Sequence, residues 1–277
     1  MYPKAGINVM QLKNLIKGIK YKGSSNNCEI LAIAYDSRKV KEGTLFIAIP
    51  GFKFDGHDYI SQAVANGATA ILANGRSPKK QSVPILQVDN PRKALSMISA
   101  QFYGHPSRSL KVIGITGTNG KTSIAHILYH IISNSNMTCG SMGTLGFRTP
   151  TGMSSTSFTT PESVEVHQML KILKMANVQN VVMEVSSHAL ELYRVNDIEF
   201  DIAVFTNISQ EHLDFHKTMK NYFNSKLKLF KNLDSSKAAV VNIDDEFSKQ
   251  IISKTNAKII SYGLNQSAKI HPIKISS

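Results

Sequence analysis

Residues 111–122 read Lys111-Val112-Ile113-Gly114-Ile115-Thr116-Gly117-Thr118-Asn119-Gly120-Lys121-Thr122, and this stretch decides the fold. Its first six residues predict a buried strand, and the apolar spacing of residues 122–133 predicts a helix. Between them, Gly117 and Gly120 let the backbone approach an anion, because they carry no Cβ. Consecutive N–H groups and the helix start would then face phosphate oxygens, with Lys121 neutralising charge and the Thr122 hydroxyl binding Mg²⁺. The sequence therefore predicts that residues 117–122 bind the phosphates of ATP.

The loop departs from the strict pattern G-x-x-x-x-G-K-[ST]. Counting back from Gly120, the first glycine would fall at Ile115, whereas the available glycines are Gly114 and Gly117. The alternative interpretation is a glycine-rich turn that binds nothing. A lysine and a threonine in register after a buried strand favour phosphate binding over this alternative.

A regular alternation of strands and helices follows the loop. Strands are predicted at 111–116, 181–185, 202–206, 238–242 and 258–261, and helices at 122–133, 164–176 and 219–233. Because the strands are apolar almost throughout, we expect burial on both faces in a parallel sheet with flanking helices. Ligands of such sheets bind at the carboxyl ends of the strands. Residues 109–277 are therefore predicted to form a P-loop-type ATP-binding domain of the α/β class.

The first hundred residues have a different organisation. Short strands are predicted at 30–35, 44–49, 70–72 and 85–88, and helices at 59–66 and 90–103. The segment 104–109 (Gly-His-Pro-Ser-Arg-Ser) is rich in turn-forming residues and has no periodicity. It places a boundary between a small mixed α/β domain at 1–108 and the domain at 109–277.

Composition narrows the class of protein. The 277 residues are 42% hydrophobic and 18% charged, which is typical of soluble globular domains. No segment approaches the roughly 20 apolar residues of a membrane helix, and lysines interrupt residues 1–22, so we expect neither membrane insertion nor a signal peptide. Cys28 and Cys139 match neither a zinc spacing nor a disulfide framework, which indicates a reducing cytoplasm.

The net charge of +13 is the unusual bulk property. It suits nucleic acid, a membrane surface or an anionic small molecule. The lysines are scattered and do not alternate with aromatic residues as a base-stacking surface requires. We therefore expect an anionic nucleotide substrate and no nucleic-acid partner. We also expect a monomer.

Three side chains downstream of the loop suggest a metal site. Glu184 lies at the end of one predicted strand, His212 follows the predicted strand 202–206, and Lys226 lies within the helix predicted at 219–233. A carboxylate and an imidazole at adjacent strand ends would complete a Mg²⁺ site beside the phosphates. Imidazole is an unusual Mg²⁺ ligand, however. Spacing alone leaves His212 open as a loop residue, Glu184 as a solvated acid and Lys226 as an exposed helix lysine.

At this point the chain resembles the Mur ligases of peptidoglycan synthesis. Within that family it resembles the MurE branch, which adds the third amino acid to UDP-N-acetylmuramoyl-L-alanyl-D-glutamate. The matching phrases occur in the family's order and cover nearly the whole chain. They are Asp36-Ser37-Arg38, the loop at 117–122, Thr159-Thr160-Pro161-Glu162, the run from Glu184 to Leu190, Thr206-Asn207-Ile208-Ser209 with Glu211-His212-Leu213-Asp214, Tyr222-Phe223 with Lys226, and Asn242 with Asp244-Asp245.

The resemblance implies roles that spacing does not assign. The UDP part of the substrate would bind at Ser37, and the UDP-muramoyl peptide at Thr159, Thr160, Ser186 and Arg194. The nucleotide site would add Asn242 to the loop, and the Mg²⁺ ligands would be Thr122, Glu184, His212 and Lys226. Lys226 would act as a carbamate (N6-carboxylysine), which turns a cation into an anion. Lys121, His212 and Lys226 would be the catalytic residues, with ATP and Mg²⁺ as cofactors.

The implied reaction is acyl activation. The side-chain carboxylate of the substrate's D-glutamate attacks the γ-phosphate of ATP, which gives an acyl phosphate and ADP. The amine of lysine or diaminopimelate then displaces phosphate from the acyl carbon. Lys121 and Mg²⁺ would neutralise charge on the transferring group, and Arg194 would pair with a substrate carboxylate or phosphate.

The chain also departs from the family in two respects. Family members have three domains, and this sequence stops at Ser277, so we expect the amino-acid site of a third domain to be missing and ligation to be weak. The letters Asp89-Asn90-Pro91-Arg92 match the motif of diaminopimelate-adding members, but at the wrong place in the chain, so we interpret them as a chance helix start. A non-catalytic nucleotide-binding or UDP-sugar-binding module, another Mur ligase, or a folylpolyglutamate synthetase remain alternatives.

Overall fold

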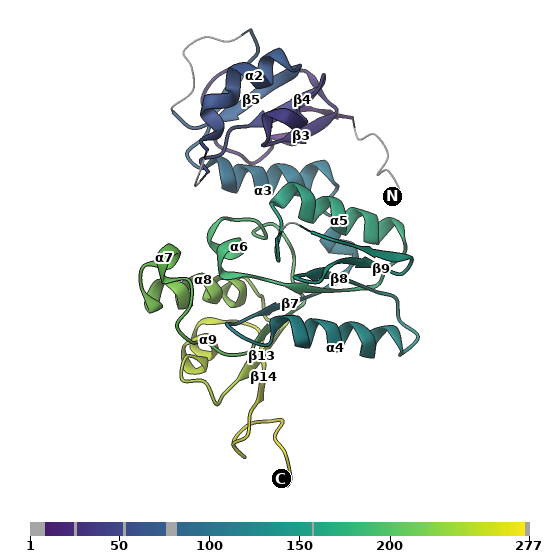
Figure 1. The fold of residues 1–277 in the computed structure, drawn as a ribbon, viewed down its shortest axis with the longest axis vertical. Helices are drawn as coiled ribbons and strands as arrows, with labels where there is room; N and C mark the ends of the chain where they lie inside the picture. Colours follow the sequence, from purple (N-terminus) through teal and green to yellow (C-terminus); the bar gives the residue numbers. More distant parts are fainter. Residues whose placement is uncertain (1–8, 25–26, 52–53, 76–81, 157, 275–277) are drawn as a thin grey trace. The chain divides into compact units, whose positions relative to one another are not determined.

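The computed structural model describes residues 9–24, 27–51, 54–75, 82–156 and 158–274. Contacts divide the chain into two compact units (Figure 1). Met1–Pro106 and Glu162–Ile172 make up the first unit, and Ser107–Pro161 and Leu173–Ser277 the second. A segment from the middle of the chain therefore groups with the N-terminal residues. Among the described helices, none combines the length and the apolarity that crossing a membrane requires.

The second unit is built on an eight-stranded sheet in the order β10-β9-β8-β11-β7-β12-β13-β14. Strands β8, β11, β7, β12, β13 and β14 are parallel, while β9 and β10 are antiparallel additions at one edge. The strands are β7 (Lys111–Thr116), β8 (Cys139–Gly143), β9 (Gly146–Thr149), β10 (Gly152–Ser154), β11 (Asn180–Glu184), β12 (Ile202–Phe205), β13 (Ala238–Asn242) and β14 (Lys258–Tyr262). The predicted α/β class with a parallel sheet is confirmed.

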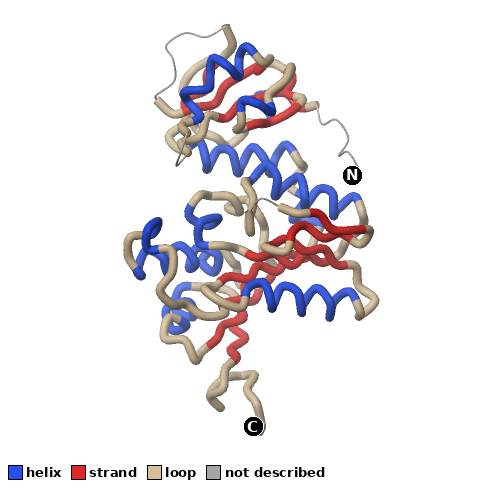
Figure 2. The backbone as a smooth tube through the Cα atoms, viewed as in Figure 1, coloured by secondary structure: helices blue, strands red, loops and turns tan. Residues whose placement is uncertain are grey.

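The helices of this unit flank the sheet (Figure 2). Helix α4 packs across β8, β11 and β7, where Ala125 joins Ile113, Val182 and Val204 in one apolar cluster. The helices are α4 (Lys121–Ser133), α6 (Ser187–Glu191), α7 (Leu213–His216), α8 (Met219–Lys231) and α9 (Ser248–Lys254). Helix α5 (Ser163–Met175) begins within the segment that groups with the first unit.

The first unit holds a four-stranded parallel sheet in the order β3-β4-β5-β6. Consecutive residues of a strand point to opposite faces; accordingly Leu45 and Ile47 belong to one buried cluster, and Phe46 to another. The elements are β1 (Met10–Gln11), α1 (Leu12–Leu15), β2 (Glu29–Ile30), β3 (Ala32–Ala34), β4 (Thr44–Ile47), α2 (Ile60–Ala65), β5 (Ala68–Ala73), β6 (Ile85–Gln87) and α3 (Pro91–Phe102), with 3₁₀ turns at Ser37–Lys39, Gly56–Tyr59 and Pro106–Ser109.

Two local predictions meet different outcomes in this unit. The single strand expected at 30–35 is wrong: the run divides into β2, which pairs with β1, and β3, which pairs with β4. Half-exposed Leu31 lies between them, so the apolar run does not mark one continuous strand. The helix start at Pro91 is confirmed, since Asn90 caps α3 by accepting a hydrogen bond from the Lys93 amide at 3.0 Å.

Candidate functional site

The loop at 117–120 follows β7 and leads into α4, as the sequence predicts. Gly117 has φ +150°, and a Cβ there would lie 1.8 Å from the Thr206 hydroxyl oxygen, so no larger residue fits. Gly120 caps α4 with φ +85°, a left-handed conformation that glycine adopts at little cost. The two glycines are thus required for different reasons, space at Gly117 and backbone conformation at Gly120.

The backbone amides of the loop do not all face an anion, contrary to the expectation from the sequence. The Thr118 amide donates to the Asn207 carbonyl at 2.8 Å, and the Asn119 amide donates to the Asn207 side-chain oxygen at 3.0 Å. Within the described part of the chain, the amides of residues 120–123 donate to no protein acceptor. The start of α4, rather than the whole loop, therefore offers the N–H groups for a phosphate.

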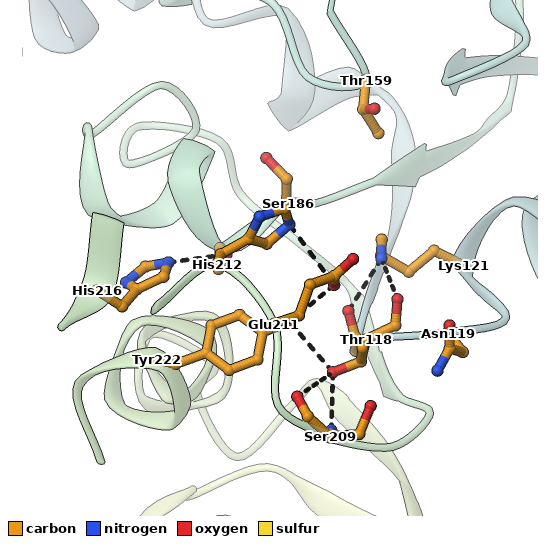
Figure 3. Close-up of polar contacts among 12 residues, drawn as sticks. Thr118, Asn119, Lys121, Thr159, Ser186, Ser209, Glu211, His212, His216 and Tyr222 are labelled. Carbon is orange, nitrogen blue, oxygen red and sulfur yellow. Dashed lines mark hydrogen bonds and ion pairs between the residues drawn. The ribbon is translucent and has the colours of Figure 1, made fainter. Parts of the chain in front are cut away.

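Lys121 folds back over the loop in this conformation (Figure 3). Its Nζ donates to the Gly117 carbonyl at 3.0 Å and to the Thr118 carbonyl at 2.7 Å. Burial lowers the pKa of Lys121, and the charges of Glu211 and Glu184 partly offset this effect. The amine is therefore held beside the helix start, and it must leave these carbonyls to reach a phosphate.

Glu184 ends β11 and is buried, which rules out the interpretation as a solvated acid. Its carboxylate accepts hydrogen bonds from the Thr122 hydroxyl at 2.8 Å and from the Thr144 amide at 2.8 Å. A Cβ at Gly143 would lie 2.1 Å from the carboxylate, so that glycine makes room for it. Two of the predicted metal ligands, Thr122 and Glu184, are therefore in direct contact.

Lys226 is only 1% exposed, so the interpretation as an exposed helix lysine is wrong. Its Nζ donates to the Gly117 carbonyl at 2.7 Å and lies 4.4 Å from the centre of the Tyr222 ring. Burial, and then the charge of Lys121, lowers the pKa of Lys226 to about 7. The amines of Lys121 and Lys226 thus both bond the Gly117 carbonyl, in the loop at 117–122 that is predicted to bind phosphate and is called the phosphate loop below.

His212 lies on the loop after β12 and is 43% exposed on its side chain. It adopts a left-handed conformation with φ +55° at the start of α7. Its Nε2 lies 3.5 Å from Glu211 Oε2, and its ring packs edge-on against His188 at 4.8 Å between centres. Among the described residues, no group of three or more His, Cys, Asp or Glu side chains is arranged to hold a metal ion.

Sequence reasoning missed the role of Tyr222 in this region. Its hydroxyl lies 3.1 Å from Thr118 Oγ1 and 3.4 Å from Glu211 Oε2, and Thr118 Oγ1 also accepts from the Ser209 amide at 2.9 Å (Figure 3). Burial is the main cause that raises the pKa of Tyr222 to about 12, so the phenol stays protonated at neutral pH. This network ties the phosphate loop to the loop after β12. Tyr222 lay within a matching phrase, but no spacing rule assigned it a contact.

The predicted substrate residues of the second unit gather around the end of β11. The Thr160 hydroxyl donates to the Glu184 carbonyl at 2.9 Å and accepts from the Ser186 amide at 3.2 Å. Ser186 caps α6, and Arg194 donates to the Thr160 carbonyl at 3.0 Å. The Thr159 hydroxyl lies 3.0 Å from that of Thr144.

Two predicted site residues remain, one in each unit. Asn242 ends β13, and its amide group donates to the Thr206 carbonyl at 2.8 Å, which joins it to the strand beside the phosphate loop. Ser37 belongs to the first unit and is buried, and its hydroxyl donates to Gln62 at 2.8 Å.

Comparison with known proteins gives consistent matches along the chain. Residues 115–277 match the family described as Mur ligase middle domain, and residues 29–103 match the Mur ligase family, catalytic domain. The chain is 42% identical over 262 residues to the UDP-N-acetylmuramoyl-L-alanyl-D-glutamate--2,6-diaminopimelate ligase of Caldanaerobacter subterraneus subsp. tengcongensis, covering 94% of this chain and 54% of that protein. Identity to the ligase of the same name from Aquifex aeolicus is 40% over 268 residues, covering 97% and 53%.

A solved structure gives the same picture in three dimensions. The structure of a UDP-N-acetylmuramoyl-L-alanyl-D-glutamate--2,6-diaminopimelate ligase superimposes with a TM-score of 0.78 at 26% identity, covering 94% of this chain and 54% of the other. MurF from Acinetobacter baumannii shares the fold, with a TM-score of 0.68 at 23% identity, covering 98% and 56%. The chain spans about half the length of the curated relatives it matches.

Proposed function

This chain belongs to the Mur ligase family, and from that premise we propose that it forms the UDP-substrate and ATP-binding parts of a ligase. The ligase would add the third amino acid to UDP-N-acetylmuramoyl-L-alanyl-D-glutamate. Relatives that are 37–42% identical are named as the diaminopimelate-adding ligase, which favours diaminopimelate over lysine as the incoming amino acid. We place the reaction in the cytoplasm and expect a monomer; the free cysteines Cys28 and Cys139 suit a reducing compartment.

The observation that carries the proposal is the buried amine of Lys226 at the phosphate loop. Because its pKa is lowered to about 7, a large share of the amine is neutral at physiological pH. A neutral amine attacks the carbon of CO₂: the C–N bond forms, one N–H proton leaves to solvent, and a carbamate anion results. This change would replace the repulsion between Lys121 and Lys226 with attraction.

The residues present fit Mg²⁺ once Lys226 is carbamylated. Glu184 and the Thr122 hydroxyl supply oxygen donors of the kind that Mg²⁺ prefers. His212 and the Lys226 carbamate would complete the set, and the second anion would offset the weak preference of Mg²⁺ for imidazole. When bound there, Mg²⁺ would neutralise charge on the phosphates of ATP.

The chemistry we propose is acyl transfer through an acyl phosphate. The glutamyl carboxylate of the substrate attacks the γ-phosphorus of ATP, the bond to the bridging oxygen breaks, and ADP leaves. The amine of the amino acid then attacks the acyl carbon and expels phosphate. Lys121 would turn from its carbonyl partners toward the γ-phosphate, and the N–H groups at the start of α4 would hold the phosphate oxygens.

The substrate-side residues receive roles that suit their present contacts. Arg194 would pair with a carboxylate of the muramoyl peptide, and Thr159 and Ser186 would contact the same peptide. Thr160 would act by holding Ser186 and Arg194. Its hydroxyl bonds the Glu184 carbonyl and the Ser186 amide, and its carbonyl accepts a hydrogen bond from Arg194. Asn242 would lie on the nucleotide side of the loop, and Ser37 would serve the UDP part.

Binding is the readout that tests this proposal. The 277-residue chain should take up ¹³CO₂ and show a carbamate signal in its ¹³C NMR spectrum, and Lys226→Met should lose that signal. Calorimetry should show Mg²⁺-dependent binding of a non-hydrolysable ATP analogue, abolished by Lys121→Met. A folded wild-type chain that binds neither the ATP analogue nor UDP-muramoyl dipeptide would refute the proposal.

A further inference from the structure

Helix α7, a single turn at Leu213–His216, lies between two residues with unusual backbone conformations. His212 before it has φ +55°, and Lys217 after it has φ +68°. Residues with a Cβ pay an energetic penalty in this left-handed region and keep such a conformation only where other contacts fix it. The turn that carries His212 is therefore held in place by its surroundings.

His216 makes the contacts that fix this turn. Its backbone amide donates to the His212 carbonyl at 2.9 Å, and its carbonyl accepts from the Thr218 amide at 2.9 Å and from the Asn221 side chain at 3.0 Å. Its ring Nε2 lies at hydrogen-bond distance, 3.0 Å, from the Ser187 hydroxyl. His216 and Ser187 are both buried, so loss of this bond would leave a polar atom without a partner away from water.

The position of this bond links the two proposed metal ligands. Ser187 is the first residue of α6, three residues after Glu184, while His216 is the last residue of α7, four residues after His212. A single buried side-chain bond thus connects the element that follows one ligand to the element that follows the other. Phe215 adds to this connection by stacking on His188 of α6 at 4.3 Å between ring centres.

We infer that His216 and Ser187 are positioning residues, whose hydrogen bond sets the distance between His212 and Glu184. The inference rests on the proposed function, because it takes His212 and Glu184 as metal ligands. Side chains behind metal ligands orient them, and their loss typically weakens metal binding by about 10- to 100-fold.

The test measures Mn²⁺, a paramagnetic substitute for Mg²⁺, by electron paramagnetic resonance on the 277-residue chain with a non-hydrolysable ATP analogue. We expect Ser187→Ala and His216→Phe to weaken Mn²⁺ binding by about tenfold. His216→Gln, whose amide nitrogen can occupy the place of Nε2, should bind Mn²⁺ within about threefold of wild type, a recovery that follows from restoring the bond.

Ser99→Ala is the matched control. Ser99 is also a buried serine that loses one hydrogen bond, to the Leu95 carbonyl at 2.7 Å, but it lies in α3 of the first unit. It should lower the unfolding temperature as Ser187→Ala does and leave Mn²⁺ affinity unchanged. Wild-type affinity in both Ser187→Ala and His216→Phe would overturn the inference and leave the proposed function intact.

A measurement without metal distinguishes failure of the proposed metal site from failure of the proposed positioning role of His216 and Ser187. In ¹H–¹⁵N imidazole spectra of the metal-free chain, Ser187→Ala and His216→Phe should shift the ring signals of His212, and Ser99→Ala should not. If wild-type chain binds no Mn²⁺, the proposed metal site fails, and the imidazole spectra still decide the coupling between Ser187 and His212. Unchanged His212 signals in both variants would overturn the inference.

Discussion

The carboxyl ends of the two parallel sheets differ in the polarity of what they bury. In the first unit, β4 and β5 end in Ile47 and Ala73, which are fully buried and apolar. In the second unit, β7 and β11 end in Thr116 and Glu184, and Thr206 directly follows β12; all three are buried. Both units bury a parallel sheet, so we attribute the buried polar groups at the strand ends of the second sheet to the proposed ligand site.

The first unit also buries charge, but away from its strand ends. Arg92 of α3 pairs with Glu162 at 3.1 Å, and His167 of α5 is completely enclosed. The Arg92–Glu162 pair joins α3 to the residue before α5. In the second unit, the Lys121 and Lys226 amines both bond the Gly117 carbonyl after β7, and Glu184 ends β11. The comparison teaches that burial of a charge alone does not indicate a candidate site; the position of the charged group at the carboxyl edge of a parallel sheet does. Four substitutions test this distinction.

The largest expected effect is at the phosphate loop. Gly117→Ala would place a Cβ 1.8 Å from the Thr206 hydroxyl oxygen at φ +150°, so either the loop or the segment that carries Thr206 after β12 must move. We expect a loss of about 4 kcal/mol in the free energy of unfolding, together with loss of ATP binding. Urea denaturation and calorimetry measure the two effects. Gly152→Ala, with nothing within 4 Å of the new Cβ, is the control; equal stability of the two variants would contradict the prediction.

The next effect concerns the buried ion pair of the first unit. Arg92→Met leaves the Glu162 carboxylate buried without its guanidinium, and we expect a loss of about 3 kcal/mol. ATP binding by the second unit should be unchanged, and the double variant with Glu162→Gln should recover much of the stability.

The control for this prediction is the exposed pair Arg108–Glu199, whose side chains are 60% and 53% exposed. Arg108→Ala should cost less than about 1 kcal/mol, because solvent screens this pair. Thermal and urea unfolding of Arg92→Met, of its double variant with Glu162→Gln, and of Arg108→Ala measure these losses of stability. If Arg92→Met abolished nucleotide binding in a folded chain, the division between structural and functional buried charge would be wrong.

The sequence predicted the central strands well because their apolar runs are uninterrupted. Strand β7 occupies residues 111–116 as expected, and β13 occupies 238–242. Strands β8 to β10 at residues 139–154 were not predicted, since their short stretches contain glycines and polar residues and show no alternation. Such strands form through pairing with a neighbour, which a single stretch of sequence does not reveal.

Parts of the candidate site formed by neighbouring residues were predictable, whereas contacts between residues far apart in the sequence were not. The loop at 117–122 is a local pattern, and its strand and helix were predictable from the residues that flank it. The contact of Lys226 with the Gly117 carbonyl joins residues 109 positions apart, so spacing favoured an exposed lysine until the resemblance suggested otherwise. Asn207 accepts hydrogen bonds from the Thr118 and Asn119 amides, and it also lies far from them in the sequence. No sequence motif contains these contacts.

The third prediction concerns the effect of pH on the free energy of unfolding through Lys226 of the second unit. Between pH 7 and pH 10.5 the unfolded chain keeps a proton on Lys226 that the folded chain, with a pKa of about 7, has released. Stability therefore rises with pH, by about 2 kcal/mol from pH 7 to pH 9. Lys226→Met should remove this rise and should be more stable than wild type at pH 7. Urea unfolding in CO₂-free buffer measures it, and parallel pH profiles for the two proteins would contradict it.

The smallest effect tests His167, a buried polar side chain of the first unit. Among the described side chains, His167 has both ring nitrogens buried without a hydrogen-bond partner. Replacing an unsatisfied polar ring with an apolar side chain removes a penalty, so His167→Leu should stabilise the chain by about 1 kcal/mol at pH 7.

Lower pH should increase the difference in stability between wild type and His167→Leu. Burial, and then the nearby charge of His105, lowers the pKa of His167 to about 3, so below pH 6.5 the unfolded chain binds a proton that the folded chain does not. Stability is therefore lost as the pH falls from 6.5 toward 3, and the advantage of His167→Leu should grow over that range. Urea unfolding at pH 7 and pH 5 tests this, with ATP binding as the second readout. A structural histidine leaves ATP affinity unchanged at pH 7; a change there would give His167 a part in the site and contradict the contrast between the units.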